Sequence, residues 1–389
     1  MHAYPFKEHT VAASLIHGAV ELEATQPTQP GLLPQRLPAW ARRQSSDPQL
    51  AMAVAQPAGV RLVFDTAATW LELDTVPTKR DYVGMPARPD GVYDLLVDGR
   101  LAQQASAPSG TILRIDMAAG TSTLVPGEVQ TLRFTGLAGH VKRVEIWLPH
   151  DETTVLVALR SDAPLQAVAA RQARRWLHHG SSISQGSNAS HPSGTWPALA
   201  AAHAGVDLLN LGFGGSALLD PFTARTMRDL PADIISVKIG INLVNTDAMR
   251  LRAFGPAVHG FLDTIRDGHP HTPLLVVSPV YCGMHEDVPG PTLFDTTVLK
   301  DGRIAFRAAG RAAETAQGKL TLNIIREQLG AIVQARRADD MHLHYLDGRE
   351  LYGAADSVDL PLPDGLHPGP AAQRLMGERF AALLAVKGL

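Results

Sequence analysis

Four short polar or glycine-rich blocks in the second half of the chain contain the residues that an acyl-transfer site needs. The blocks are Gly180-Ser181-Ser182, Gly212-Phe213-Gly214-Gly215-Ser216, Gly240-Ile241-Asn242 and Asp364-Gly365-Leu366-His367-Pro368. Ser182 offers a hydroxyl nucleophile, and His367 offers an imidazole, the side chain whose ordinary pKa is closest to working pH. Asp364 lies three residues before His367 and can fix the imidazole tautomer and stabilise its charged form. The blocks therefore predict a serine nucleophile activated by a histidine–aspartate pair.

The same blocks also supply hydrogen-bond donors for the negative charge that develops during acyl transfer. Gly215 offers an unobstructed backbone N–H, Asn242 a side-chain amide and Ser182 its own backbone N–H. In other enzymes each such donor contributes roughly 3–4 kcal/mol to stabilising the transition state. A single Gly-Ser-Ser is usually only a turn, so the prediction of an oxyanion hole depends on all four blocks together.

The elements that position these blocks follow from the periodicity after residue 174. Apolar runs typical of buried strands alternate with stretches that have an apolar face at helical spacing. Strands are expected at 176–177, 208–212, 234–239, 274–278 and 342–346, and helices around 194–199 and at 254–266, 320–337 and 370–386. This alternation favours right-handed βαβ units and a parallel sheet with helices on both faces. Because such sheets bind ligands at the carboxyl ends of their strands, the four blocks are expected to converge there.

The first part of the chain shows a different pattern. Apolar residues alternate with polar ones in many short runs between residues 60 and 159, and Pro-Asp-Gly at 89–91 and Pro-Gly at 126–127 supply turns. This predicts a β-sandwich over residues 1–165, a connector over 161–173 and a second domain over 174–389. Four aromatic residues could line a sugar-binding face, although core packing is the commoner role of such side chains. They are Trp40, Trp70, Tyr93 and Trp147.

The order Gly-x-Ser, glycine-rich block, Gly-x-Asn and Asp-x-x-His-Pro resembles the SGNH, or GDSL-type, serine hydrolase family over residues 174–389. The resemblance implies a flavodoxin-like three-layer α/β/α sandwich that needs no metal or cofactor. It also implies a catalytic triad of Ser182, Asp364 and His367, with an oxyanion hole formed by Ser182, Gly215 and Asn242. The first half, with Gly91-Val92-Tyr93-Asp94-Leu95, resembles the β-sandwich that precedes the catalytic domain in a two-domain subgroup.

The chain departs from the family pattern at two positions. Ser181 stands where the family usually has an aspartate, and Leu243 follows Asn242 where an aspartate is frequent. The first position is outside the triad, so the chemistry is expected to survive, whereas Leu243 is expected to change how the asparagine loop is braced. Ser181 and Ser184 are rival hydroxyls, and the register of the motif favours Ser182 over both.

Composition excludes several other classes of protein. The 389-residue chain has a formal net charge of −3, so no basic field is available for nucleic acid. Its one cysteine, Cys282, excludes an internal disulfide, and a buried inert thiol is expected there. We find neither a signal peptide nor an apolar run of membrane-spanning length, so a cytoplasmic location is expected. The pairs His178-His179, His269-x-His271 and His342-x-His344 lack nearby carboxylate or cysteine clusters, which favours hydrogen-bonded histidines over metal ligands.

These observations predict a cytoplasmic two-domain serine esterase that acts on a small-molecule ester. The same residues would serve an acyltransferase that moves an acyl group, including an aryl one, onto a hydroxyl of a sugar or natural product. A non-catalytic carbohydrate-binding protein is the alternative from another class. The segment 283–302 is rich in proline, glycine and charge, and we expect it to shape the acyl or alcohol pocket.

Overall fold

A computed structural model describes residues 7–9, 11–25, 30–168, 173–298 and 303–388 of the chain. The chain divides into two compact units. Unit 1 comprises residues 1–36, 54–172 and 191–193, and unit 2 comprises residues 37–53, 173–190 and 194–389. Residues 169–172 of the predicted connector and 299–302 of the predicted pocket segment lie outside the described residues.

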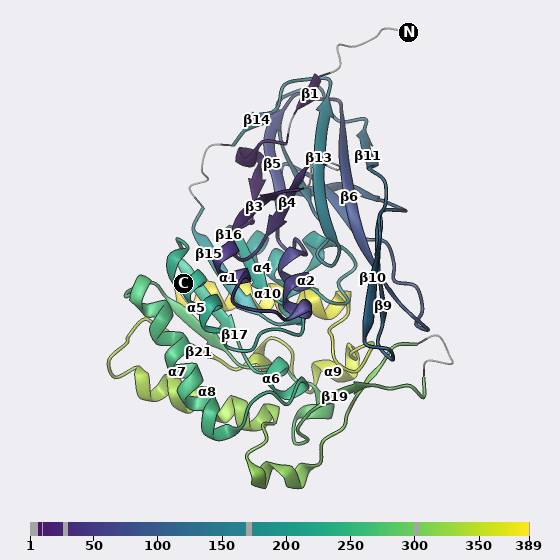
Figure 1. Cartoon of the computed structure of the whole chain (residues 1–389). Helices are drawn as coiled ribbons and strands as arrows, with labels where there is room; N and C mark the ends of the chain where they lie inside the picture. Colours follow the sequence, from purple (N-terminus) through teal and green to yellow (C-terminus); the bar gives the residue numbers. More distant parts are fainter. Residues whose placement is uncertain (1–6, 10, 26–29, 169–172, 299–302, 389) are drawn as a thin grey trace. The chain divides into compact units, whose positions relative to one another are not determined.

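Unit 1 contains two β-sheets (Figure 1). The larger sheet has the order β10-β9-β6-β13-β4-β3, with β11 also paired to β6 and β1 to β13. The smaller sheet has the order β14-β5-β12-β7-β8, with β2 also paired to β5. The strands are β1 (Lys7–His9), β2 (Ile16–His17), β3 (Glu21–Ala24), β4 (Leu32–Gln35), β5 (Arg61–Thr66), β6 (Trp70–Tyr82), β7 (Val92–Val97), β8 (Arg100–Ser106), β9 (Thr111–Asp116), β10 (Thr121–Val125), β11 (Gln130–Thr135), β12 (Lys142–Trp147), β13 (Thr153–Ser161) and β14 (Gln166–Ala167).

The two sheets of unit 1 enclose one hydrophobic core. Leu71 and Leu73 of β6 are buried in the same cluster as Leu62 and Phe64 of β5. The intervening polar residues point away from the core, as the alternation in the sequence predicts. A fully buried side chain of this size stabilises a fold by roughly 1.5–3 kcal/mol relative to an exposed one. Two sheets over one shared core are the arrangement expected of a β-sandwich.

The aromatic residues of the first half serve mainly as core. Tyr93 is fully buried, and its hydroxyl lies 3.3 Å from Thr75 Oγ1. Trp147 is buried as well, with its indole N–H donated to Glu145. A sugar-binding face that includes these two side chains is therefore wrong, because neither ring is open to a ligand. Trp70 is half-buried, and Trp40 belongs to unit 2, where the Arg225 guanidinium lies 5.2 Å from its ring.

The expectation of β structure throughout residues 1–165 is wrong for residues 39–55. These residues form helices α1 (Ala39–Arg42) and α2 (Pro48–Ala55). Proline at the first helical position and four alanine or methionine residues after it favour a helix, and the segment lacks the period-two alternation of a strand. Leu50, Ala53 and Val54 form the buried side of α2 at helical spacing.

Unit 2 is built on a five-stranded parallel sheet with the order β16-β15-β17-β18-β21. Counted along the chain this is the order 2-1-3-4-5, which is that of flavodoxin-like folds. The elements are β15 (Arg175–Gly180), α3 (Ser182–Gln185), α4 (Trp196–Ala204), β16 (Asp207–Gly212), α5 (Pro221–Asp229), β17 (Ile234–Lys238), α6 (Ile241–Asn245), α7 (Leu251–Gly268), β18 (Leu274–Val277), β19 (Thr292–Phe294), β20 (Phe306–Ala308), α8 (Leu322–Arg336), β21 (Leu343–Leu346), α9 (Asp356–Asp359) and α10 (Pro370–Lys387). All five predicted strands and the four predicted helices of this half are present.

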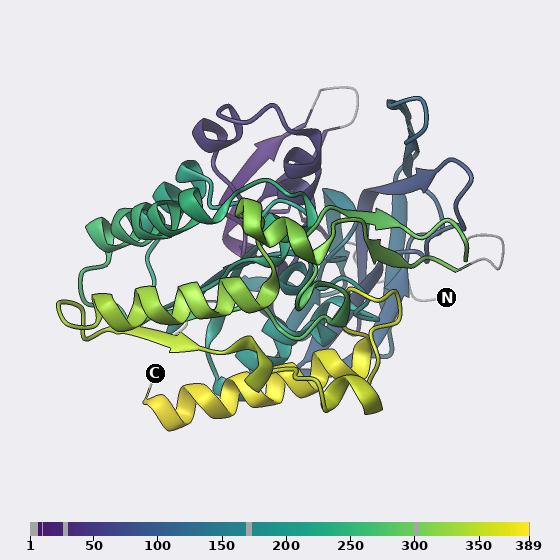
Figure 2. The ribbon, with the colours of Figure 1, turned by 90° about the horizontal axis from the view of Figure 1, so that it is seen from below.

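Helices cover both faces of this sheet. Trp176 of β15 packs on Trp196 of α4 and Phe380 of α10, so these two helices share one face. On the other face the ring of His179 stacks on Phe261 of α7, and the Tyr345 hydroxyl of β21 donates to the Arg326 carbonyl of α8. Figure 2 shows α8 and α10 on opposite sides of β21. The three-layer α/β/α architecture is thus confirmed, and no helix among the described residues is long and apolar enough to span a membrane.

Candidate active site

The turn that carries the predicted nucleophile Ser182 lies between β15 and α3, at the carboxyl end of the central part of the sheet. Ser181 is the N-cap of α3, and its Oγ accepts a hydrogen bond of 3.3 Å from the Ile183 N–H. Gly180 is required at the end of the strand, because a Cβ there would lie 2.3 Å from Ser184 Oγ. Ser182 is consequently held at the first helical position, where the chain order reverses between β15 and β17 and such sheets bind their ligands.

Ser182, His367 and Asp364 form a continuous chain of hydrogen bonds. Ser182 Oγ lies 2.9 Å from His367 Nε2, and His367 Nδ1 lies 2.7 Å from Asp364 Oδ2. The other oxygen of Asp364 accepts from the backbone N–H groups of His367 and Leu366, at 2.7 and 2.9 Å. The loop that carries the aspartate and histidine is therefore tied to the carboxylate itself, which fixes the imidazole relative to the serine.

The carboxyl group of Asp364 is mostly buried but remains ionised. Burial raises its pKa, but the hydrogen bonds from His367 Nδ1 and from the backbone N–H groups, together with the charge of His367, outweigh burial and leave the pKa below its ordinary value. An ionised Asp364 accepts a hydrogen bond from His367 Nδ1–H, which keeps the proton on Nδ1. The lone pair of His367 Nε2 then points at the Ser182 hydroxyl, as a general base requires.

A fourth side chain contacts this carboxylate. The Asn188 amide donates to Asp364 Oδ2 at 3.1 Å and to the His367 carbonyl at 3.4 Å. Asn188 has a φ of 64°, in the left-handed region that asparagine tolerates better than most residues. The sequence alone does not point to Asn188, because an asparagine in a Gly-Ser-Asn loop is typical of any turn.

The three expected oxyanion donors follow three neighbouring strands: Ser182 follows β15, Gly215 follows β16 and Asn242 follows β17. The backbone N–H groups of Ser182 and Gly215 make no hydrogen bond within the described part of the chain. Asn242 Oδ1 accepts from the Ala217 N–H at 3.1 Å, which orients the amide and leaves its NH₂ group as a donor. Gly215 has a φ of +76°, which only glycine adopts without strain.

Two glutamines clamp the loop that carries Gly215. Gln185 of α3 accepts from the Gly214 N–H at 2.8 Å, and Gln49 of α2 donates to the Gly214 carbonyl at 2.8 Å. Gln185 thereby couples α3, which carries Ser182, to this loop. Neither glutamine was expected from the sequence, and Gln49 lies in a segment expected to be β structure more than 160 residues away.

The rival serines have other partners. Ser181 caps α3, and Ser184 is fully buried with its Oγ 2.8 Å from His178 Nε2. His178 Nδ1 in turn lies 2.7 Å from Ser236 Oγ, and burial, followed by the charges of His179 and Lys238, lowers the pKa of His178 well below its ordinary value. His178 is thus a neutral, hydrogen-bonded histidine. Within the described residues no group of three potential metal-ligating side chains occurs.

Two further expectations concern residues beside the site. Cys282 is buried, as the sequence predicts, and burial raises the pKa of its thiol to about 12. Leu243 is buried in the core after Asn242. Thr246 instead braces this loop, because its backbone N–H and its hydroxyl both donate to the Asn242 carbonyl, at 3.0 and 2.8 Å.

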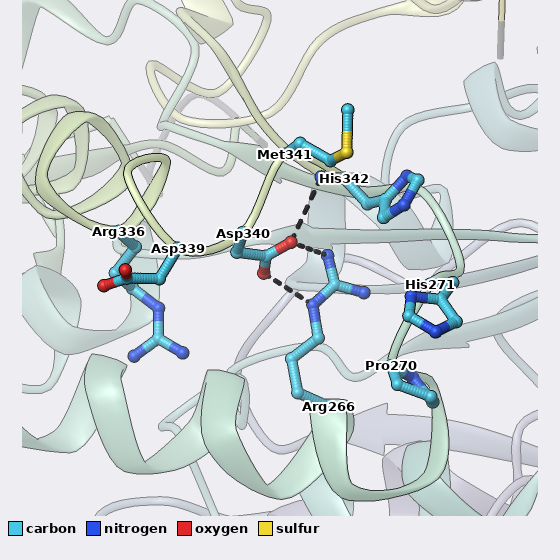
Figure 3. Close-up of a pocket in the computed structure, with 8 residues that line it drawn as sticks. All are labelled: Arg266, Pro270, His271, Arg336, Asp339, Asp340, Met341 and His342. Carbon is cyan, nitrogen blue, oxygen red and sulfur yellow. Dashed lines mark hydrogen bonds and ion pairs between the residues drawn. The ribbon is translucent and has the colours of Figure 1, made fainter.

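A cavity of about 580 Å³ lies away from these residues, beside the amino ends of β18 and β21 (Figure 3). Arg266 in this cavity is paired with Asp340, and its Nε lies 2.7 Å from Asp340 Oδ2. Arg336 donates to His259 and Asp263. The cationic side chains are therefore already neutralised, and none of the residues predicted to do chemistry lines this cavity.

The chain is similar to known proteins in both sequence and structure. Residues 174–285 match the model of the GDSL-like lipase/acylhydrolase family. The salicylyl-acyltransferase SsfX3 from a tetracycline biosynthetic pathway is 28% identical, with a TM-score of 0.80 over 100% of this chain and 99% of that chain. No curated protein sequence matches the chain.

Two carbohydrate-active esterases share the fold at lower identity. A family two carbohydrate esterase from Cellvibrio japonicus is 13% identical, with a TM-score of 0.55 over 98% of this chain and 97% of that chain. An acetyl xylan esterase, Est2A, from the rumen bacterium Butyrivibrio proteoclasticus is 14% identical, with a TM-score of 0.53 over 98% of each chain. Residues 174–285 thus match the GDSL-like lipase/acylhydrolase family, the full chain is similar to SsfX3, and the two esterases share its fold.

Proposed function

We propose that the chain is a serine esterase that works through an acyl-enzyme on Ser182. The observation that carries the proposal is the hydrogen-bonded series Ser182 Oγ, His367 Nε2, His367 Nδ1 and Asp364 Oδ2, with distances of 2.9 and 2.7 Å. A hydroxyl within hydrogen-bond reach of an imidazole, which is itself oriented by a carboxylate, is the arrangement that activates a serine nucleophile.

The reaction follows from the roles that this geometry allows. Ser182 Oγ attacks the ester carbonyl while His367 Nε2 takes its proton. The N–H groups of Ser182 and Gly215 and the Asn242 amide stabilise the oxyanion. His367 then gives its proton to the departing alcohol, and Asp364 stabilises the imidazolium meanwhile. A water molecule, deprotonated by the same imidazole, releases the acid and restores Ser182.

Acyl transfer to an alcohol is the second candidate, and one observation favours it. The protein with 28% identity and full-length structural similarity is a salicylyl-acyltransferase. An alcohol in place of water would use the same residues, so the two reactions differ only in which nucleophile the site binds and how well it excludes water. A purely carbohydrate-binding role is disfavoured, because a non-catalytic protein has no use for the triad geometry.

We also propose that unit 1 is an accessory domain and that unit 2, which adds residues 37–53 to most of the predicted range 174–389, is the catalytic domain of a cytoplasmic enzyme with small-molecule substrates. The reduced, buried thiol of Cys282 is compatible with a reducing compartment. Fractionation of cells that express the tagged full chain tests the location. Recovery with cytosolic marker enzymes is expected, and recovery with extracytoplasmic markers would refute this part of the proposal.

The decisive experiment compares hydrolysis with transfer. The protein is mixed with a panel of activated short-chain and aryl esters, with and without polyhydroxylated acceptors, and both the free acid and any new ester are quantified by mass spectrometry. Ser182→Ala is the control. Free acid as the main product with every acceptor supports the esterase. A new ester that forms in preference to acid supports the acyltransferase, and equal product from wild type and Ser182→Ala refutes both.

A further inference from the structure

The segment that follows β18 brings two aromatic side chains to the catalytic histidine. Strands β19 and β20 pair in antiparallel fashion with Phe294 directly opposite Phe306, and the centroids of their rings lie 4.9 Å apart. The ring of Phe306 also packs on the ring of His367, with centroids 5.7 Å apart and planes at 75°. This edge-to-face geometry is a favourable one for aromatic rings. His367, Phe306 and Phe294 therefore form a continuous row of rings.

This hairpin is fixed to the catalytic loop. The Phe306 N–H donates to the Asp364 carbonyl at 2.9 Å. Thr292 lies on the same side of β19 as Phe294, since side chains alternate along a strand, and its hydroxyl donates to Asn245 Oδ1 at 2.9 Å. Leu293 and Arg307 occupy the opposite side. The side of the hairpin that carries the two rings thus faces the body of unit 2, and the rings are held in place before any ligand binds.

Both rings remain half-buried, although they lie beside a mostly buried triad. Apolar surface beside the triad remains in contact with water here. A ligand that covers this surface removes it from water, which makes binding more favourable. Ligand sites have this composition, namely mostly apolar walls around a few oriented polar groups. The row of rings therefore has the character of a binding surface rather than of core.

The chemistry decides which part of a substrate meets this surface. The carbonyl oxygen is directed to Gly215 and Asn242, whereas His367 exchanges a proton with the alcohol oxygen. In transfer the alcohol O–H proton passes to His367 Nε2, the alcohol oxygen bonds to the acyl carbon, the bond from that carbon to Ser182 Oγ breaks, and the proton returns to Ser182 Oγ. The alcohol part of the substrate consequently lies beside the imidazole and the rings that contact it.

We propose that Phe306 and Phe294 form a subsite for an aromatic ring on the alcohol part of the substrate, whether that alcohol leaves during hydrolysis or enters during transfer. This inference deepens the proposed function and rests on the acyl-enzyme mechanism. It assigns the substrate class on the alcohol side as an aryl-bearing alcohol.

Partitioning of a common acyl-enzyme tests the subsite. The enzyme is acetylated with p-nitrophenyl acetate, and acetate and acetyl ester are quantified in the presence of benzyl alcohol, cyclohexylmethanol or ethanol. Because every reaction starts from the same acyl-enzyme, the ratio of ester to acetate reports only the acceptor. Wild type is expected to favour benzyl alcohol over cyclohexylmethanol by several-fold, and Phe306→Ala is expected to lose most of this preference, a change of about fivefold.

Two further variants separate the subsite from general damage to the fold. Phe306→Leu keeps an apolar side chain and is expected to lose the aromatic preference while Ser182 is still acetylated, which mass spectrometry of the variant checks. Leu293→Ala, on the opposite side of the same hairpin and 44% exposed, is expected to keep the preference.

The subsite would be overturned by equal partitioning to the three alcohols in wild type, or by an unchanged preference in both Phe306 variants. If the mass spectrum still shows acetylated Ser182 in these cases, the proposed function stays intact. Absence of acetylated Ser182 would overturn the proposed function and the subsite together.

Discussion

Asn188→Asp tests whether Asn188 sets the electrostatics of the triad. In the wild-type protein the amide NH₂ of Asn188 donates to Asp364 Oδ2 at 3.1 Å, and the same oxygen lies 2.7 Å from His367 Nδ1. The substitution replaces a donor by a negative charge within about 6 Å of the imidazole. Aspartate also tolerates the left-handed backbone at this position, so the loop is expected to keep its conformation.

The size of the effect follows from Coulomb's law. Two unit charges about 6 Å apart interact with about 0.7 kcal/mol in water and about 3 kcal/mol at an effective dielectric constant of 20. Asn188 is exposed, so the lower figure applies. The new negative charge favours the protonated imidazolium of His367, which cannot act as a base. The acid limb of the profile of kcat/KM against pH is therefore expected to move to higher pH by about half a pH unit.

The assay measures kcat/KM for p-nitrophenyl acetate between pH 4 and pH 9, at low and at high salt. High salt is expected to shrink the shift, because it screens exposed charges. Asn188→Ala is the matched control, since it removes the same hydrogen bond without adding charge. A profile of Asn188→Asp that coincides with that of Asn188→Ala at low salt would refute the reasoning.

Three other changes give independent predictions. Asp364→Asn should lower kcat by about three orders of magnitude, because the NH₂ group of asparagine imposes the wrong tautomer on His367. Little stability should be lost, because the asparagine oxygen still accepts from the two backbone N–H groups. Steady-state kinetics and thermal unfolding measure the two effects, and a kcat within tenfold of wild type would contradict the prediction. Gln49→Leu removes the hydrogen bond to the Gly214 carbonyl and should lower kcat about fivefold. Gln44→Leu is the control, because Gln44 lies on the same segment as Gln49 and loses only a hydrogen bond from Arg225. Equal kcat in the two variants would argue against the clamp. Lys238 is buried, and burial, followed by the charge of Arg326, lowers its pKa to about 7. Between pH 7 and 10 the unfolded chain therefore binds more protons than the folded chain, so the free energy of unfolding should rise with pH in that window. Lys238→Met should raise the urea midpoint at pH 7 and flatten this rise, and an unchanged slope would contradict the assignment.

The sequence predicted those parts of the fold that depend on local patterns. Buried runs such as 274–278 and amphipathic stretches such as 254–266 mark the strands and helices of unit 2, because each pattern needs only neighbours in sequence. Motifs with fixed spacing such as Asp-x-x-His can also be recognised from the sequence alone. The prediction of β structure is wrong for residues 39–55, because two helices of four and eight residues have too few turns to show a helical periodicity in the sequence.

The supporting residues of the site could not be predicted in this way. Asn188 and Gln49 matter only because the folded chain brings them to Asp364 and Gly214. The contact between Phe306 and His367 likewise depends on where a long segment returns to the sheet. Common residue types in loops become interpretable only once their partners in space are known.

Acylation of Ser182 tests the central claim most directly. The full chain is mixed with p-nitrophenyl acetate, quenched in acid within the first turnovers, and analysed by intact-protein and peptide mass spectrometry, with Ser182→Ala in parallel. The account predicts a single acetyl group on the peptide that contains Ser182 and none on the variant. An acetyl group on Ser181 or Ser184 instead, or wild-type release of p-nitrophenolate by Ser182→Ala, would contradict it.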